Sequence, residues 1–317
     1  MVHSRSAGCL STGIYLDYQA STPLDPRVSV AMAPYWTEFC GNPHATEHAF
    51  GWAADKAVET ARRHVANLIG ADPDEIVFTS GATEANNLAV LGMARAAHHD
   101  RRKIVTSVLE HVSILAATRA LEEEGFRVAL VPVDNNGVIN PDAVAATIDE
   151  RIAIVSVMAV NNEIGTVQPI ERIASTCRSN GVPFHVDAAQ ALSCLPIDVA
   201  NMGIDLMSIS AHKAYGPKGI GALYVRRGLA PHPRPLVFGG GQEWGLRPGT
   251  LPVPLCVGFG EACRILFEER EQDIRHATTM RDTLLRCIME HIPDVKVNGA
   301  FIPRHPGNLN LIFPGVD

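Results

Sequence analysis

A lysine in the second half of the chain follows an apolar run and could act as an amine nucleophile. Lys213 comes just after the predicted strand Leu206 to Ser210 and just before a glycine-rich turn over residues 216–219. Where apolar sequence removes an ammonium group from water, its charged form is disfavoured, so the amine becomes available for covalent chemistry. Taken alone, Lys213 could equally be a surface lysine with a hydrated tip.

An acid ends another predicted strand. Asp187 directly follows the run Phe184 to Val186. A carboxylate next to a pyridine nitrogen keeps that nitrogen protonated, and the pair attracts by roughly 4 kcal/mol at about 4 Å for an effective dielectric constant of about 20. A protonated pyridine ring is an electron sink. Taken alone, Asp187 could also be the N-cap of the segment that follows it.

A short polar motif, Ser80 to Glu84, lies between a predicted strand and a predicted helix. The N–H groups at a helix start and the positive end of the helix dipole bind anions such as phosphate, and Thr83 adds a hydroxyl group. Simple helix capping is the commoner use of such residues. The motif has one glycine and no Gly-Lys-Ser/Thr ending, so it is neither a P-loop nor a dinucleotide fingerprint.

Two more polar groups follow predicted strands. His111 comes after Ile104 to Val108, and a neutral imidazole there could stack on an aromatic cofactor ring and transfer protons. The run Asn161 to Gly165 ends the most apolar strand, where side-chain amides could bind a ring oxygen or a substrate carboxylate. Ligands of open α/β sheets bind beyond the carboxyl ends of the strands. Five polar positions along this edge therefore predict one shared binding site.

The elements that must position this site alternate along the chain. From Ile76 onward, short β-branched runs alternate with amphipathic stretches of helical period, the pattern of βαβ units. We expect an α/β fold with a mainly parallel seven-stranded sheet sandwiched by helices. The expected strands are 76–79, 104–108, 128–133, 152–160, 184–186, 206–210 and 221–225, and the expected helices include 52–69 (ending at Gly70 as C-cap), 84–97, 113–124 and 170–180.

A loop-rich stretch after Arg226, with prolines at 231, 233 and 235 and glycines at 239–241, predicts a change of domain. We expect a large cofactor-binding domain over residues 1–255 and a smaller, incomplete α+β domain over residues 256–317. The N-terminal segment 1–26 is expected to pack on the small domain. Beyond Leu255 the pattern predicts a helix to about Glu269, a second helix to about His291, and a strand over Leu309 to Phe313.

Composition limits the possible functions. The 317 residues are 46% apolar, enough for a large core, and the net charge of −7 gives no basic surface for a nucleic acid or an anionic membrane. No apolar run is long enough to span a bilayer and no secretory signal is visible, so we expect a cytoplasmic protein with a small-molecule ligand. The seven cysteines, an odd number with no Cys-x-x-Cys pair, predict reduced thiols.

Residues 44–48 suggest a different chemistry. They read His-Ala-Thr-Glu-His, which fits the inverted zinc-peptidase motif H-x-x-E-H. That motif needs a helix with both histidines on one face. The preceding Gly41-Asn42-Pro43 delays helix entry, and no third ligand can be identified. We therefore expect no metal site.

Together the motifs resemble those of the cysteine desulfurases in the class-V aminotransferase family. The resemblance runs from about Tyr15 to Phe313. It implies the fold of the pyridoxal-phosphate-dependent transferases, which is similar to that of aspartate aminotransferase, and pyridoxal 5'-phosphate as the cofactor. The matching runs are YLDYQASTPLDPR (15–27), SGATE (80–84), EH (110–111), NNEIG (161–165), HVDAAQ (185–190), SAHKAYGPKG (210–219) and RPGT (247–250).

The resemblance implies a role for each matched residue. Lys213 would form a Schiff base with pyridoxal phosphate, His111 would stack on the cofactor ring, and Asp187 would pair with its pyridine nitrogen. Lys213 and His111 would be the catalytic residues. The remaining implied roles are phosphate binding by Ala82, Thr83, Ser210 and His212, contact with the ring oxygen side by Asn162 and Gln190, and contact with the phosphate of the neighbouring subunit by Thr250.

The resemblance also implies a homodimer that converts L-cysteine to L-alanine. The sulfur would pass as a persulfide to an acceptor or scaffold protein, for iron–sulfur cluster or thio-cofactor assembly. In the family, the persulfide cysteine and the arginine that binds the substrate carboxylate lie downstream of the segment matched by Asn308 to Asn310. We therefore expect a C-terminally truncated chain that lacks both residues, and nominate none of the seven cysteines as a substitute.

Two other functions stay open on the sequence. One is a pyridoxal-phosphate-binding scaffold or fragment with impaired catalysis. The other is a related class-V enzyme such as a selenocysteine lyase, because such relatives share the cofactor-binding residues.

Overall fold

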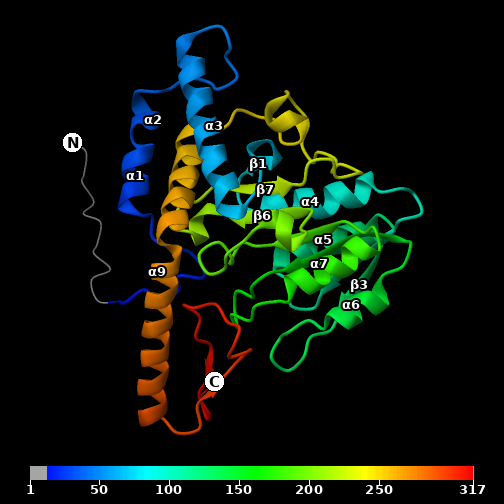
Figure 1. Cartoon of the computed structure of the whole chain (residues 1–317), viewed down its shortest axis with the longest axis vertical. Coiled ribbons are helices and arrows are strands. Elements are labelled where there is room, and N and C mark those ends of the chain that lie inside the picture. The colour runs from blue at the N-terminus through cyan, green and yellow to red at the C-terminus, as the bar shows by residue number, and fades with distance from the viewer. Residues whose placement is uncertain (1–12, 317) are drawn as a thin grey trace, which may run out of the picture.

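A seven-stranded sheet forms the centre of the computed structural model, which describes residues 13–316 (Figure 1). The strands are β1 (Ile76–Thr79), β2 (Lys103–Ser107), β3 (Arg127–Val131), β4 (Ile152–Met158), β5 (Phe184–Asp187), β6 (Leu206–Ser210) and β7 (Gly221–Val225). Their order across the sheet is β1-β7-β6-β5-β4-β2-β3. Strands β2 to β6 are parallel to their neighbours in this group, and β7 is antiparallel to β1 and β6. The predicted mainly parallel seven-stranded sheet is confirmed.

Helices cover both faces of this sheet. The longer ones are α3 (Ala49–Ile69), α4 (Ala82–Ala96), α5 (Val112–Glu123), α7 (Ile170–Ser179) and α9 (Val253–His291). Helices α4 and α5 share a core with Val77 on one face, and α3, α7 and α9 share a core with Phe78 on the other. Consecutive residues of one strand are thus buried against different layers. This two-sided burial explains why the strands read as continuous apolar runs.

Shorter elements connect these layers. They are α1 (Pro26–Met32), α2 (Pro34–Thr37), α6 (Pro141–Thr147), α8 (Val199–Met202), the 3-10 turns Pro73–Glu75, Ala211–Lys213 and Gln242–Gly245, and the two-stranded pair β8 (Lys296–Val297) and β9 (Leu311–Ile312). No helix within residues 13–316 has both the length and the apolar composition needed to cross a membrane.

Helix α3 begins and ends as its sequence requires. Gly70 has a φ of 68° and donates its N–H to the carbonyl of Ala66, which confirms the predicted left-handed C-cap. At the other end, His48 is the N-cap, and its Nδ1 accepts the N–H of Gly51 at 3.1 Å. Residues 44–47 precede the helix, so His44 and His48 do not share a helical face and the zinc-peptidase geometry is absent.

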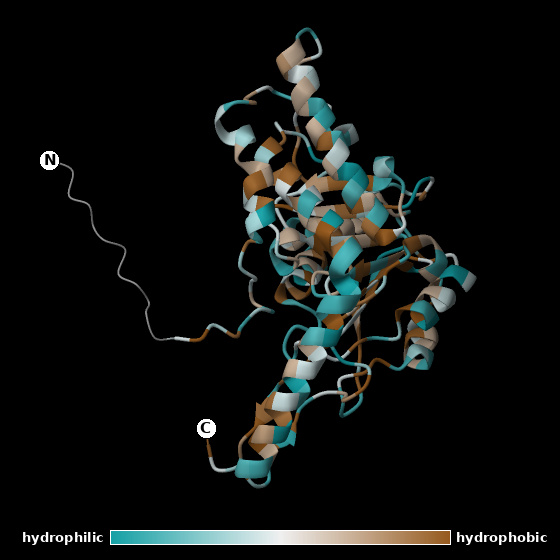
Figure 2. Ribbon diagram, turned by 60° about the vertical axis from the view of Figure 1, so that its left-hand side comes forward, coloured by the Kyte–Doolittle hydropathy of each residue, from teal (hydrophilic) through white to brown (hydrophobic). Residues whose placement is uncertain are grey.

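The prediction of two helices after Leu255 is wrong. Helix α9 is a single element, because residues 261–291 contain neither glycine nor proline and nothing ends the helix near Glu269. Its first half packs on α3, and its second half extends away from the sheet (Figure 2). The predicted terminal strand is shorter than expected and pairs with β8, which the sequence did not predict.

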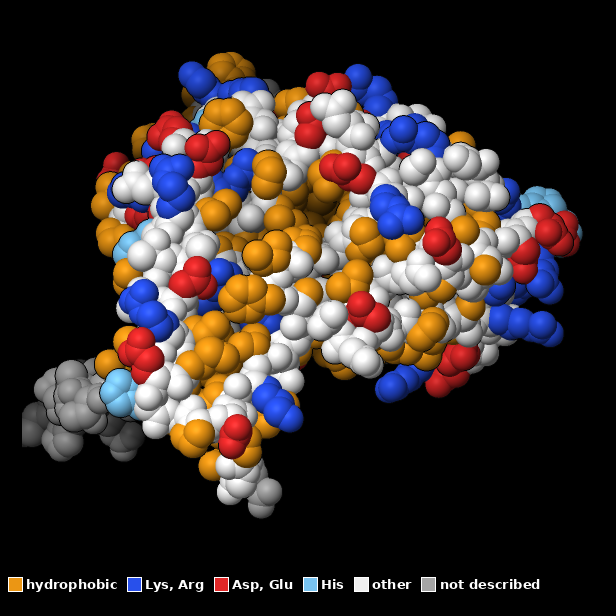
Figure 3. Space-filling view, turned by 60° about the horizontal axis from the view of Figure 1, so that its bottom comes forward, with side chains coloured by type: hydrophobic (Ala, Val, Ile, Leu, Met, Phe, Trp, Pro, Cys, Tyr) orange, Lys and Arg blue, Asp and Glu red, His pale blue; other side chains and the backbone are white. Residues whose placement is uncertain are grey.

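The division into two domains stays a prediction. Its boundary after Leu255 falls in the first turn of α9. Hydrophobic side chains are visible at several places on the face drawn in Figure 3. In the C-terminal segment, Phe301 and Ile302 are 55% and 83% exposed.

A buried ion pair fixes the loop between β7 and α9. Arg62 on α3 binds the carboxylate of Glu243 at 2.7 and 2.8 Å, and Glu243 also accepts the backbone N–H of Phe78 at 2.6 Å. The side chains of Arg62 and Glu243 are only 4% and 1% exposed. Glu243 and Trp244 adopt φ angles of 48° and 55°, which non-glycine residues rarely hold. The ion pair therefore holds a strained turn in place.

Replacing Glu243 with alanine should destabilise the fold by about 3–5 kcal/mol, because it leaves the Arg62 guanidinium buried without its main partner. Urea unfolding followed by circular dichroism measures this loss. The matched control is Glu59→Ala, which removes the other carboxylate of the same arginine; Glu59 is 41% exposed, so its loss should cost less than about 1 kcal/mol. Equal losses in the two variants would contradict the importance of the buried pair.

Candidate functional site

A cavity of about 710 Å³ opens at the carboxyl ends of the parallel strands. Of the ten residues predicted for the site, nine line this cavity and one does not. Thr250 is exposed in the loop before α9 and lies outside it, so its implied contact with a neighbouring subunit stays a prediction. The nine residues that line the cavity are Ala82, Thr83, His111, Asn162, Asp187, Gln190, Ser210, His212 and Lys213.

The start of α4 forms one end of the cavity. Gly81 is the N-cap, and the first N–H groups of the helix have no intrahelical acceptor. The loop can lie close to the sheet because Gly221 of β7 has no side chain. A Cβ at this position would stand only 2.7 Å from the Cα of Gly81. The carboxylate of Glu84 turns back to accept the N–H of Ser80 at 2.6 Å and the Nε–H of Arg247 at 2.9 Å. The helix start therefore presents N–H groups to the cavity.

Ser210 adds a hydroxyl group to the same end. Its Oγ is buried and has no hydrogen-bond partner among residues 13–316. A buried polar atom normally has a partner, since leaving one unmade costs about 1–3 kcal/mol. A ligand oxygen in the cavity would supply that partner. The free N–H groups of α4 and the Ser210 hydroxyl together fit a phosphate group.

Asp187 ends β5 as a buried carboxyl group. Its Oδ1 accepts the N–H of Ala189 at 3.0 Å and its Oδ2 accepts the amide of Asn86 at 2.7 Å. Burial raises the pKa of Asp187, and the hydrogen bonds oppose this effect. Both partners are neutral N–H groups. Asp187 can have both of its predicted roles. One oxygen caps the turn, and the carboxyl group, which forms no direct ion pair among residues 13–316, could pair with a protonated ring nitrogen.

Lys213 is not a hydrated surface lysine. It ends the short 3-10 turn after β6, and its Nζ donates to the backbone carbonyls of Gln19 and Ala20. Burial lowers the pKa of Lys213, although the nearby carboxylates of Asp17 and Asp187 oppose the shift. The direction is the one expected for a lysine that serves as a nucleophile.

Gln19 connects the N-terminal segment to the site and to the end of the chain. Its carbonyl oxygen accepts from Lys213 and, at 2.9 Å, from Gln190 Nε2. Its side-chain oxygen accepts from Asn308, whose amide also donates to the carbonyl of Glu163 at 3.0 Å. Residues 13–26 thus contact both predicted domains, and residues 1–12 lie outside the described part of the chain.

Sequence reasoning missed several residues that line the cavity. Gln19 lies within the matched run 15–27, but nothing in its type indicates a backbone contact with a lysine. Asn86 follows Thr83 by three residues, so the helical period places both on one face of α4, a signal that could have identified it. Lys218 belongs to the glycine-rich turn after Lys213 and adds a second amine to the cavity wall.

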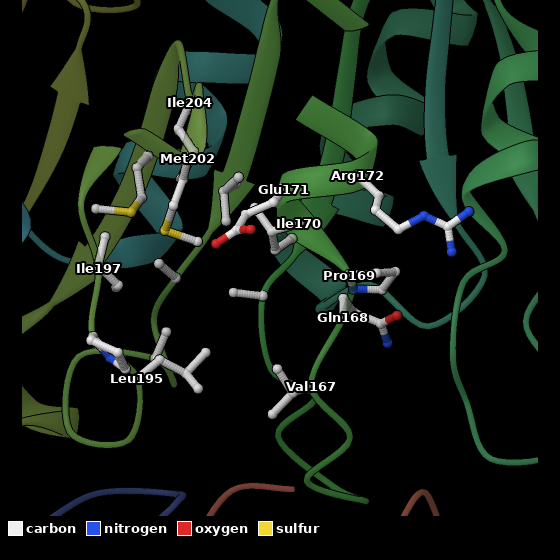
Figure 4. Close-up of a pocket in the computed structure, with 16 residues that line it drawn as sticks. Val167, Gln168, Pro169, Ile170, Glu171, Arg172, Leu195, Ile197, Met202 and Ile204 are labelled. Atoms are coloured by element: carbon white, nitrogen blue, oxygen red, sulfur yellow. The ribbon is translucent and has the colours of Figure 1, made fainter. Parts of the chain in front are cut away.

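Other features offer less chemistry. A second cavity, of about 340 Å³, lies beside the start of α7 and is lined mostly by apolar side chains (Figure 4). The guanidinium of Arg172 points away from it (Figure 4) and lies 3.7 Å from Asp142. Within the described residues, the one close group of three possible metal ligands is His98, His99 and Asp100, and all three are exposed. Neither feature matches the convergence of polar groups in the first cavity.

Glu110 is a second buried acid next to the site. Burial raises its pKa to about 8, the nearby carboxyl group of Asp187 adds to the shift, and the Ser107 hydroxyl, which donates to Oε1 at 2.6 Å, opposes it. The other oxygen, Oε2, is buried and has no partner among the described residues. Burial therefore favours the neutral form of Glu110, and a neutral Glu110 does not compete with Asp187 for a cation.

Glu110 should make the fold less stable at alkaline pH. The folded state holds the proton more tightly than the unfolded state, whose ordinary pKa is 4.5, so the free energy of unfolding should fall as the pH rises from about 5 to about 8. The glutamine of Glu110→Gln cannot titrate, so the free energy of unfolding of this variant should decrease less over the same pH range. Urea unfolding across this pH range measures the difference, with Glu122→Gln on the exposed side of α5 as the control. Identical pH profiles for wild type and Glu110→Gln would contradict the assignment.

Comparisons with known proteins agree with this geometry. The family model described as aminotransferase class-V matches residues 14–317. A cysteine desulfurase IscS of Rickettsia akari (strain Hartford) is 53% identical over 308 residues, which are 97% of this chain and 75% of that relative. A solved structure titled "NIFS-LIKE PROTEIN" is 36% identical with a TM-score of 0.92, covering 96% of this chain and 83% of its own. Another, titled "SspA in complex with cysteine", is 39% identical with a TM-score of 0.82, covering 95% of this chain and 84% of its own. This chain therefore belongs to the class-V aminotransferase family, among its cysteine desulfurases.

Proposed function

We propose that this chain is a pyridoxal-phosphate-dependent cysteine desulfurase that removes sulfur from L-cysteine and leaves L-alanine. Class-V aminotransferases and cysteine desulfurases depend on pyridoxal phosphate. The observation that carries the proposal is that one cavity joins three groups: the amine of Lys213, the buried carboxyl group of Asp187 and the unpartnered hydroxyl of Ser210. These groups fit the aldehyde, ring nitrogen and phosphate of that cofactor.

Each part of the cofactor has candidate residues. Thr83 and Ala82 at the start of α4, with Ser210 and His212, would hold the phosphate. Asp187 would pair with the ring nitrogen, and His111 would lie against the ring. When bound, pyridoxal phosphate supplies a carbonyl group for amines and a protonated ring that withdraws electrons from the substrate Cα. Asn162 and Gln190 would contact the ring oxygen side.

The protein's own groups determine how protons move in this site. Lys213 must leave the carbonyls of Gln19 and Ala20 before its amine can react. Because burial disfavours the ammonium form, the released amine can accept a proton at Nζ. A bound cation would favour the ionised form of Asp187, which would then keep the ring nitrogen protonated. These steps need no residue outside the cavity.

Sulfur transfer needs a thiol that the cavity does not supply. No cysteine of residues 13–316 lines it. Cys177, Cys194, Cys256 and Cys263 are buried, and burial raises the pKa of each thiol, so their thiolates are disfavoured. A thiolate would attack the substrate sulfur and form an S–S bond, the persulfide, as the C–S bond breaks. The electron pair of that bond would stay on the substrate carbon, which takes up a proton and becomes the methyl group of alanine. We propose that the persulfide sulfur then passes to an acceptor or scaffold protein.

A homodimer in the cytoplasm is part of this proposal. Aromatic side chains are exposed around α2 and the start of α3: Trp36 and Trp52 are each 60% exposed, and Phe50 is 66% exposed. Exposed apolar patches of this kind mark interfaces, and self-complementary dimers are the commonest oligomers. The six cysteines of the described residues are unpaired, as expected in a reducing compartment.

The purified wild-type protein with pyridoxal phosphate should show a visible absorption band. Reduction with borohydride should then attach the cofactor to Lys213, detectable as a mass increase on the peptide that contains it. Lys213→Ala should lose both signals. Lys218→Ala, which changes a second lysine of the same cavity wall, should keep the adduct on Lys213. Attachment to another lysine in wild type would refute the proposed site.

Turnover should appear as equal amounts of alanine and sulfide from L-cysteine when an excess of a small thiol replaces the acceptor. Lys213→Ala should reduce the rate by at least about a hundredfold, the lower range for loss of a proton-transfer group. Amino-acid analysis and a sulfide assay measure the two products. A protein that holds the cofactor on Lys213 but forms no alanine would support the scaffold function instead.

A further inference from the structure

The Nδ1 atom of His111 lies at the start of helix α5. His111 is the N-cap of this helix, and its Nδ1 accepts the backbone N–H of Ser113 at 3.2 Å. A backbone N–H can only donate, so Nδ1 must carry a lone pair. In a neutral imidazole, one nitrogen accepts and the other carries the proton. The neutral His111 ring therefore has its proton on Nε2.

The side chain of Ser113 favours the same tautomer. Ser113 Oγ lies 2.8 Å from His111 Nδ1 and 2.9 Å from Asn86 Nδ2. The Asn86 amide also lies 2.7 Å from a carboxylate oxygen of Asp187, which accepts when ionised, so Nδ2 must face both groups. Asn86 thus donates one proton to Asp187 and the other to Ser113. The Ser113 hydroxyl is left to donate its own proton to Nδ1.

These bonds connect the acid to the histidine, with Asn86 donating to both sides. Asn86, Ser113 and Asp187 are 1%, 6% and 5% exposed, so water does not compete strongly for the bonds. His111 itself lines the cavity, and neither of its two hydrogen bonds uses Nε2. The Nε2–H group is thus the part of the ring that is available to a ligand.

We propose that Asn86 and Ser113 are positioning residues that fix His111 as a hydrogen-bond donor toward the cavity, through Nε2. The group that His111 recognises is then an acceptor, such as a carboxylate or phenolate oxygen, and not an ammonium group. The inference rests on the proposed function only in taking this cavity as the ligand site. The chain of hydrogen bonds is a property of the protein alone.

The tautomer can be measured by nitrogen NMR of the full chain with isotope-labelled histidine, without turnover. The His111 signals are identified by their loss in His111→Gln. We expect an acceptor-type signal for Nδ1 and a protonated Nε2. A proton on Nδ1, or equal populations of the two tautomers, in the wild-type protein would overturn the proposal even if Lys213 binds the cofactor as expected.

Variants test the two positioning residues. Ser113→Ala should lower the ratio of the Nε2–H to the Nδ1–H tautomer about fivefold, the change expected for loss of one ordinary hydrogen bond, and Ser113→Thr should restore it. Asn86→Asp should cause a similar loss, because its carboxylate would accept the Ser113 proton. Asn87→Asp is the matched control on the same helix, since Asn87 donates to the carbonyl of Thr83 and should leave the ratio unchanged.

Equal ratios in wild type, Ser113→Ala and Asn86→Asp would refute the positioning role. If Asn86→Asp fails to fold, the pair Ser113→Ala and Ser113→Thr still decides the question. Both variants replace Ser113, but only threonine keeps a hydroxyl group that can donate to Nδ1 of His111. A structural defect alone would alter stability without moving the proton on the His111 ring.

Discussion

The buried carboxyl group of Asp187 is the constraint on which the site depends. It stands at the carboxyl end of β5, the central strand of the seven-stranded sheet, where burial makes its charge costly. Its two hydrogen bonds come from neutral groups, and the adjacent acid Glu110 is held in its neutral form. Among residues 13–316 no cation forms a direct ion pair with Asp187, and the charge of Lys213 opposes the effect of burial only partly. A ligand with a protonated ring nitrogen completes the balance.

The other groups of the cavity are arranged around this charge by the sheet. Strands β2, β4, β5 and β6 are parallel, so the residues that follow them meet at one edge. The start of α4 and Ser210 form an anion site at one end. Lys213 lies where burial disfavours its ammonium form, held by backbone carbonyls of the N-terminal segment. One cavity thus holds an anion-binding end and a buried carboxyl group, the two features that the proposed cofactor would use.

Two long-range contacts connect this edge to the rest of the chain. Gln19 joins Lys213 and Gln190 to Asn308, and a Cβ at Gly165 would lie 2.5 Å from the side chain of Asn308, so the C-terminal segment approaches the loop after β4 closely. The pair of Arg62 and Glu243 holds the loop that carries Thr250 at its far end. The segments around the cavity are thus fixed by buried polar groups and not by apolar packing alone.

The sequence by itself determined the fold class, the strands of the sheet and nine of the residues that line the cavity. Apolar runs bounded by polar residues show where buried strands end, and parallel strands bring those ends together, so Asp187, Lys213 and His111 could be predicted as neighbours. It did not reveal the single helix α9, because a change from apolar to charged residues resembles a helix end although no glycine or proline stops it. Only the tertiary structure showed the hydrogen bonds that Gln19, Asn86 and Ser113 make, since a hydrogen bond across distant segments leaves no periodic pattern. The position of the proton on the His111 ring is likewise decided by its neighbours in space, because the sequence does not say which of the two ring nitrogens of a neutral histidine carries the proton.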